Sequence, residues 1–93
     1  MARMANDPTL TLDTCGLLCP MPLLRLGRAV RDAHEAGSSD QTFRLLATDR
    51  KAKTDIPAYC AEHGLTLIEE WEEEGVYGFI VRYQQDQYLE PIL

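Results

Sequence analysis

Four stretches of the chain combine apolar runs with an alternation of apolar and polar residues, which is the pattern of β-strands. They are residues 9–13, 42–48, 65–71 and 76–83. The second is more continuously apolar than the first, which predicts a central position in a sheet. The last two flank residues 72–75, three glutamates and a glycine, which predicts a hairpin whose like charges discourage edge-to-edge pairing.

Two further stretches have apolar residues at helical spacing. In residues 20–36, one face holds Leu23, Leu26, Val30 and Ala33. Gly27 lies inside this stretch, which indicates either close packing on a neighbour or simple tolerance. The second helix follows a charged connection, can be capped by Thr54 or Asp55, and runs through residues 56–64. Its apolar face holds Ile56, Tyr59 and Cys60.

The predicted order is therefore strand, helix, strand, helix, strand, strand, in a single α/β domain. Strands joined through one helix normally run parallel with a right-handed crossover, so we expect the first two strands to be parallel. Residues 8–83 are predicted to form the domain and residues 1–7 to be disordered. Residues 84–93 form a tail that either wraps back or stays loose.

Composition and charge narrow the possible functions. Fifteen acidic and nine basic side chains give a formal net charge of −6, which disfavours direct binding to nucleic acid. No stretch has the apolar length of a membrane span, and the N-terminus lacks the apolar core of a signal peptide. We therefore expect a cytoplasmic protein without membrane contact. Three cysteines at uneven spacing fit neither a disulfide framework nor a zinc site, so we expect reduced thiols and no bound metal.

Cys19 lies where the first strand's loop meets the first helix. Proline is favoured in the first turn of a helix, so Pro20 and Pro22 mark a helix start directly after Cys19. Unpaired N–H groups and the helix dipole favour a thiolate at such a position. This predicts a site for sulfur chemistry, with the alternative that Cys19 is a small apolar residue that fills the helix end.

A parallel arrangement of the first two strands brings their outgoing loops to the same edge of the sheet. The second loop carries Asp49, Arg50, Lys51 and Lys53. With Arg25 from the first helix, Arg50, Lys51 and Lys53 form a predicted basic rim that can support a thiolate or persulfide and meet an acidic partner, and Asp49 is expected to contact the partner with them. The alternative is that these long side chains are simply solvated.

The other cysteines and the histidines suggest no second site. Cys60 lies on an apolar helix face and is expected to be a core residue. Cys15 either links to Cys19 through a disulfide or polysulfide, or fills a strand end, and we favour the second interpretation. His34 and His63 have no companions at ligand spacing.

The run from Leu12 to Pro22, LDTCGLLCPMP, resembles the TusA/SirA-like family of small sulfur-carrier proteins, whose hallmark is a CPxP motif after an LDxxGLxC lead. The likeness continues through residues 46–49, 55–60 and 72–82, and so covers residues 10–83. It implies a two-layer sandwich in which two helices pack on one face of a four-stranded mixed sheet. It also implies that Cys19 accepts sulfane sulfur as a persulfide, with Gly16, Pro20 and Pro22 supporting its loop.

The resemblance further implies a sulfurtransferase that works between protein partners without a cofactor. The expected donor is a cysteine desulfurase or a rhodanese, and the expected acceptor serves tRNA thiolation, molybdenum-cofactor assembly or sulfur oxidation. We expect a monomer or at most a weak dimer. Two departures are Cys15 and Arg50, the latter standing where relatives commonly have proline. The alternative function is a regulatory or redox-sensing interaction module that uses the Cys19 loop without carrying sulfur.

Overall fold

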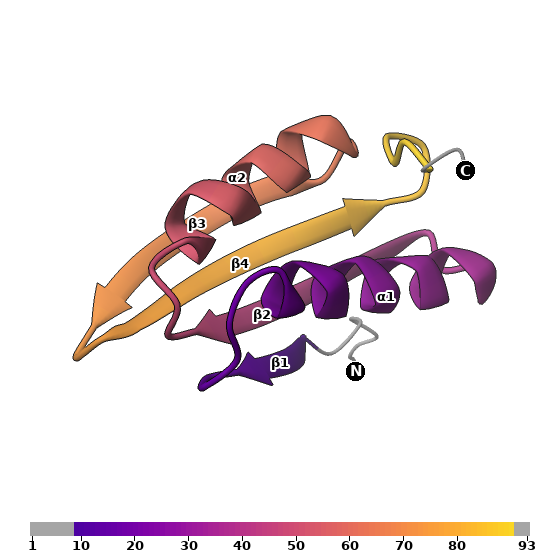
Figure 1. Ribbon diagram of the computed structural model, residues 1–93. Coiled ribbons are helices and arrows are strands. Elements are labelled where there is room, and N and C mark those ends of the chain that lie inside the picture. The colour runs from indigo at the N-terminus through magenta and orange to yellow at the C-terminus, as the bar shows by residue number, and fades with distance from the viewer. Residues whose placement is uncertain (1–8, 91–93) are drawn as a thin grey trace, which may run out of the picture.

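The computed structural model describes residues 9–90 and has six elements (Figure 1). In chain order they are β1 (Leu10–Thr14), α1 (Met21–Glu35), β2 (Asp40–Ala47), α2 (Ala52–Glu62), β3 (Thr66–Glu73) and β4 (Val76–Gln84). The predicted order of elements is confirmed. The predicted disorder of residues 1–7 lies outside the described residues.

The four strands form one mixed sheet in the order β1-β2-β4-β3. β1 runs parallel to β2, while β4 is antiparallel to both β2 and β3. Both helices lie on the same side of this sheet, side by side, as Figure 1 shows. The α/β fold with a two-layer arrangement is therefore confirmed, and the ends of β1 and β2 point to the same edge.

The core lies between the sheet and the two helices. Alternate residues of the central strands are buried toward the helices, namely Phe43, Leu45, Ala47, Tyr77, Phe79, Val81 and Tyr83. The helices contribute buried residues from the faces that the sequence predicts, Leu26, Val30, Ile56 and Cys60. Gly27 is where α1 meets α2, because a Cβ atom there would lie 2.6 Å from the Tyr59 hydroxyl oxygen. The interpretation of Gly27 as a close-packing residue is confirmed.

Two boundaries differ from the prediction for tertiary reasons. Helix α2 begins at Ala52, before the expected caps, because Ala52 is fully buried in the core. Lys53 consequently lies in the first turn of α2 and not in the preceding loop. Strand β2 begins at Asp40, which pairs with Gln84 of β4 and whose carboxylate accepts hydrogen bonds from the Arg82 guanidinium.

The hairpin between β3 and β4 is tighter than residues 72–75. Glu74 and Gly75 form its turn with φ angles of 52° and 81°, as a two-residue turn of twisted strands requires. The register shifts between Leu67 and Glu69, which leaves Ile68 52% exposed.

The tail wraps back over the far ends of the helices through residue 90. The Leu89 N–H donates to the His63 carbonyl at 2.9 Å, and the buried Tyr88 ring packs against the rings of His34 and Tyr83. Gly64, with φ of 68°, lies against the Gln87 carbonyl. Of the two interpretations of the tail, wrapping is therefore confirmed for residues 85–90, and residues 91–93 lie outside the described part.

Replacing Cys60 with alanine should lower the free energy of unfolding by about 1 kcal/mol, because the lost sulfur leaves a small cavity in the core. Burial raises the pKa of the Cys60 thiol to about 11, so this thiol should also alkylate slowly in the folded protein. Urea denaturation measures the first effect, with the exposed Cys15→Ala as the matched control. Equal stability of both variants would contradict the assignment of Cys60 to the core.

Candidate functional site

The loops that follow β1 and β2 are joined by hydrogen bonds at the edge of the sheet. The parallel register pairs Thr14 with Ala47 at the strand ends, and the Thr14 hydroxyl donates to the Leu46 carbonyl at 2.5 Å. One step further, the Gly16 N–H donates to Thr48 Oγ1 at 2.8 Å. The predicted meeting of the two loops is therefore confirmed.

The Asp49 carboxylate connects the loop of Cys19 to the start of α2. Its Oδ2 accepts the Cys19 backbone N–H at 2.7 Å, and its Oδ1 accepts the Lys51 backbone N–H at 3.1 Å. These bonds, that of Cys19 first, hold the pKa of the Asp49 carboxyl below its ordinary value, because they stabilise the charged form. Asp49 thus fixes the backbone at Cys19 from a neighbouring loop.

Cys19 directly precedes the N-cap of α1, as Pro20 and Pro22 predict. Pro20 is the N-cap residue, and Pro22 lies buried in the first turn. The Cys19–Pro20 peptide bond is cis, and Gly16 has φ of 86°, which favours glycine in the loop. The Cys19 side chain is half-buried and packs against the core, so it is only partly accessible to solvent.

The electrostatic prediction for Cys19 is wrong in direction. Partial burial raises the pKa of the Cys19 thiol above its ordinary value, and the carboxylates of Asp49 and Asp55 raise it further. Lys51 opposes them but contributes less. Negative charges and lost hydration both disfavour a thiolate, and here they outweigh the cation. Asp55, which the sequence suggested only as a helix cap, is therefore part of the electrostatic site.

The predicted basic rim is only partly gathered around the thiol. Lys51 lowers the pKa of Cys19, whereas Lys53 pairs with Glu72 at 3.7 Å and lies 5.7 Å from the centre of the Tyr77 ring. Lys53 thus points toward the β3–β4 hairpin. Arg25 and Arg50 are exposed, and their predicted contact with a partner stays a prediction.

All three cysteines are free thiols. Cys15 is exposed, so the interpretation that it fills a strand end is wrong; Thr14, one residue earlier, is the buried residue there. The Cys15 backbone N–H donates to the Asp13 carboxylate at 3.0 Å. Slight desolvation and Asp13 raise the pKa of the Cys15 thiol, so it too is disfavoured as a thiolate.

Comparison with known proteins places this site in a family. The model of the family described as Sulfurtransferase TusA matches residues 10–83. The chain belongs to the TusA family. It is 35% identical over 83 residues to the sulfur carrier protein TusA of Pseudomonas aeruginosa, with 89% of this chain and 100% of that protein covered.

Other TusA relatives also match most of this chain. The sulfur carrier protein TusA of Pseudomonas paraeruginosa is 37% identical over the same shares of both chains. A putative sulfur carrier protein of Neisseria meningitidis is 34% identical over 74 residues, which cover 80% of this chain and 95% of that protein. Membership of the TusA family supports a sulfur-carrier role and interaction with proteins that donate and accept sulfur. Neither helix within residues 9–90 is long and apolar enough to cross a membrane.

Replacing Asp55 with asparagine should lower the pKa of the Cys19 thiol, because it removes a negative charge that disfavours the thiolate. Lys51→Gln should raise this pKa for the opposite reason. The pH dependence of Cys19 alkylation, followed by mass spectrometry in a Cys15→Ser background, measures both shifts. If both substitutions shifted the pKa of Cys19 in the same direction, the charges of Asp55 and Lys51 would not be what controls this pKa.

Proposed function

We propose that Cys19 accepts sulfane sulfur as a persulfide and passes it to an acceptor protein. The observation that carries this proposal is a free, half-buried thiol beside the N-cap of α1, with its backbone N–H held by Asp49, in a chain of the TusA family. No other cysteine combines these features, since Cys60 is buried, and Cys15 is not adjacent to the N-cap of α1 and donates its backbone N–H to Asp13.

The transfer is an exchange at sulfur. The Cys19 thiolate attacks the outer sulfur of the donor's persulfide, so that a new S–S bond forms at Cys19 and the donor's S–S bond breaks. The donor's thiolate leaves with the bonding electron pair and takes up the proton that Cys19 released. An acceptor thiolate then repeats the step on the Cys19 persulfide. Each step conserves the number of persulfides, so it needs no external oxidant, reductant or cofactor.

The raised pKa of Cys19 suits a carrier that reacts only with its partners. A protonated thiol reacts slowly with small electrophiles in solution, because the thiolate is the nucleophile. Once deprotonated, a thiol of higher pKa is the stronger nucleophile. A partner that brings a cation close to Cys19 opposes the effect of Asp49 and Asp55 on the thiol, as Lys51 does in part, and can thereby release the proton at the moment of contact.

The residues around Cys19 divide into positioning and contact roles in this proposal. Gly16, Pro20, Pro22 and Asp49 shape and hold the loop. The cations Arg25, Arg50, Lys51 and Lys53 meet the partner proteins. The donor is a cysteine desulfurase or a rhodanese, and the acceptor belongs to tRNA thiolation, molybdenum-cofactor assembly or sulfur oxidation. Exposed charges of this kind mainly change the rate of encounter.

Cys19 alone should be indispensable for carrying sulfur. After incubation with inorganic polysulfide, the parent, Cys15→Ser and Cys60→Ala should each gain the mass of one sulfur atom, reversible by a reducing agent, and Cys19→Ser should gain none. Intact-protein mass spectrometry measures this gain. A Cys19→Ser protein that still acquires a reducible sulfur would overturn the proposal, and a parent that acquires none would favour an interaction module.

A further inference from the structure

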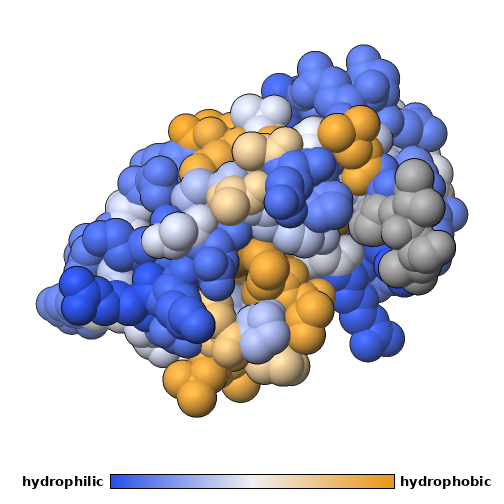
Figure 2. Space-filling view, turned by 45° about the horizontal axis from the view of Figure 1, so that its top comes forward, coloured by the Kyte–Doolittle hydropathy of each residue, from blue (hydrophilic) through white to orange (hydrophobic). Residues whose placement is uncertain are grey.

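Large apolar side chains are exposed around Cys19 without packing in the core. Leu18 is 74%, Met21 43% and Leu24 56% exposed, and they make up three of the six large apolar residues exposed within residues 9–90. In Figure 2, hydrophobic side chains gather over the β1–α1 loop and the start of α1, with hydrophilic side chains beside them. We call Leu18, Met21 and Leu24 the apolar patch.

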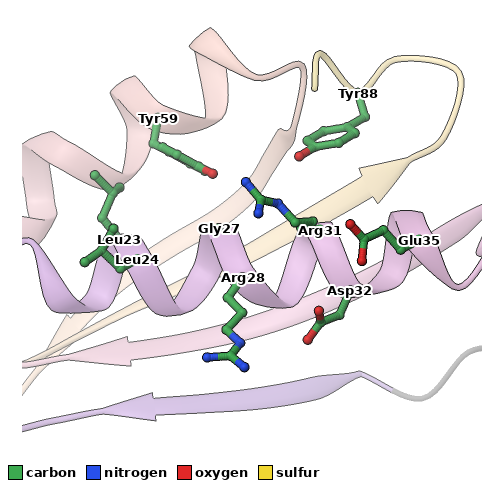
Figure 3. Close-up of a pocket in the computed structure, with 9 residues that line it drawn as sticks. All are labelled: Leu23, Leu24, Gly27, Arg28, Arg31, Asp32, Glu35, Tyr59 and Tyr88. Carbon is green, nitrogen blue, oxygen red and sulfur yellow. The ribbon is translucent and has the colours of Figure 1, made fainter. Parts of the chain in front are cut away.

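The apolar patch continues into a groove along α1. Leu24 begins a line of exposed side chains one helical turn apart that includes Arg28 and Arg31. These residues line a cavity of about 560 Å³, together with Leu23, Gly27, Asp32, Glu35, Tyr59 and Tyr88. Figure 3 shows the Arg31 guanidinium and the hydroxyls of Tyr59 and Tyr88 pointing toward one another from three elements. Because Gly27 has no side chain, the Tyr59 hydroxyl can approach α1 closely at the bottom of this groove.

The polar groups of the groove are available to a ligand. The ion pairs within residues 9–90 involve His34, Lys53 and Arg82, and not Arg28 or Arg31. In Figure 3, Arg28 and Asp32 extend to the side of α1 opposite the Arg31 guanidinium, and Glu35 lies further along the helix, where it would repel a carboxylate that reached beyond Arg31. The groove therefore favours an anion at Arg31 and the two tyrosine hydroxyls and disfavours one further along.

We propose that the apolar patch and this groove form one docking surface for the partner protein that exchanges sulfur with Cys19. The partner presents apolar side chains around its own reacting cysteine and a carboxylate about 10 Å from the side chain that meets Leu24, because the seven residues from Leu24 to Arg31 rise about 1.5 Å each along α1. The inference rests on the proposed function and adds the chemistry of the partner's surface. It is supported by the convergence of the Arg31 guanidinium with the hydroxyls of Tyr59 and Tyr88, and by the absence of an ion pair of Arg31 within residues 9–90.

The two halves of the surface have different expected effects. Desolvated apolar contacts at the centre of an interface mainly slow dissociation, whereas exposed cations mainly speed encounter and make it dependent on salt. Exposed apolar side chains that gather in one patch are also a mark of interaction sites. The patch thus lets a partner stay bound while sulfur is exchanged, and the arginines orient it along α1.

The test compares sulfur loading of Cys19 from protein donors with loading from inorganic polysulfide. The donors are a cysteine desulfurase supplied with L-cysteine and a persulfide-loaded rhodanese. The patch variant carries Leu18→Ser, Met21→Ser and Leu24→Ser. The single variant Leu18→Ser is tested beside it, so that a folding defect of the triple variant does not decide the result. The matched control carries Leu10→Ser, Ile68→Ser and Leu89→Ser, three residues that are exposed to a similar degree elsewhere. Arg28→Gln with Arg31→Gln tests the groove.

Polysulfide should load the parent, patch variant and control at equal rates. The protein donor that loads the parent should load the patch variant about tenfold more slowly, as loss of a few central contacts does at interfaces, and should load the control like the parent. The arginine variant should load more slowly and lose part of its dependence on salt, because Arg25, Arg50, Lys51 and Lys53 remain.

Equal loading of patch variant and parent by the protein donors would overturn the docking surface. So would a parent that neither protein donor loads faster than polysulfide does. If sedimentation shows a parent dimer that the patch variant disperses, the surface belongs to a second copy and the inference fails. A parent that polysulfide also fails to load would instead overturn the proposed function, and the docking surface with it.

Discussion

The site depends on one carboxylate that holds two loops in register. Asp49 accepts the backbone N–H groups of Cys19 and Lys51, and so fixes the residue before the N-cap of α1 to the N-cap residue of α2. This contact exists only because β1 and β2 are parallel and end at the same edge of the sheet. The order of strands, the start of both helices and the place of the thiol are thus consequences of one arrangement.

The same carboxylate that positions Cys19 also works against its ionisation. Asp49 and Asp55 raise the pKa of the thiol, and Lys51 offsets them only in part. The chain therefore combines a well-fixed cysteine with a thiol that is protonated when no partner is present. For a sulfur carrier this combination limits oxidation of the thiol by small oxidants, because the thiolate is the form that is oxidised. It also makes the partner's surface part of the chemistry.

Local patterns in the sequence predict the elements and the position of Cys19, because alternation, helical spacing and the two prolines act over short distances. They do not predict effects that arise only when distant segments pack. The early start of α2 follows from burial of Ala52, and Lys53 turns to Glu72 because the β3–β4 hairpin lies beside it. The pKa of Cys19 was predicted in the wrong direction because the partial burial of the thiol, and its approach to Asp49 and Asp55, arise only when the chain folds. The sequence does not distinguish Leu24 from the apolar helix residues that are buried, whereas in the structure it is exposed.

The rate of sulfur transfer from a persulfide-loaded donor protein to Asp49→Asn, relative to the parent, tests this account most directly. Asparagine removes a charge that raises the pKa of Cys19, so electrostatics alone would make the variant faster near neutral pH. It also cannot accept both N–H groups, since its amide nitrogen is a donor. If the Asp49 contact positions Cys19, transfer to the variant is slower although its thiol is more acidic. Transfer that is equal or faster would contradict the account.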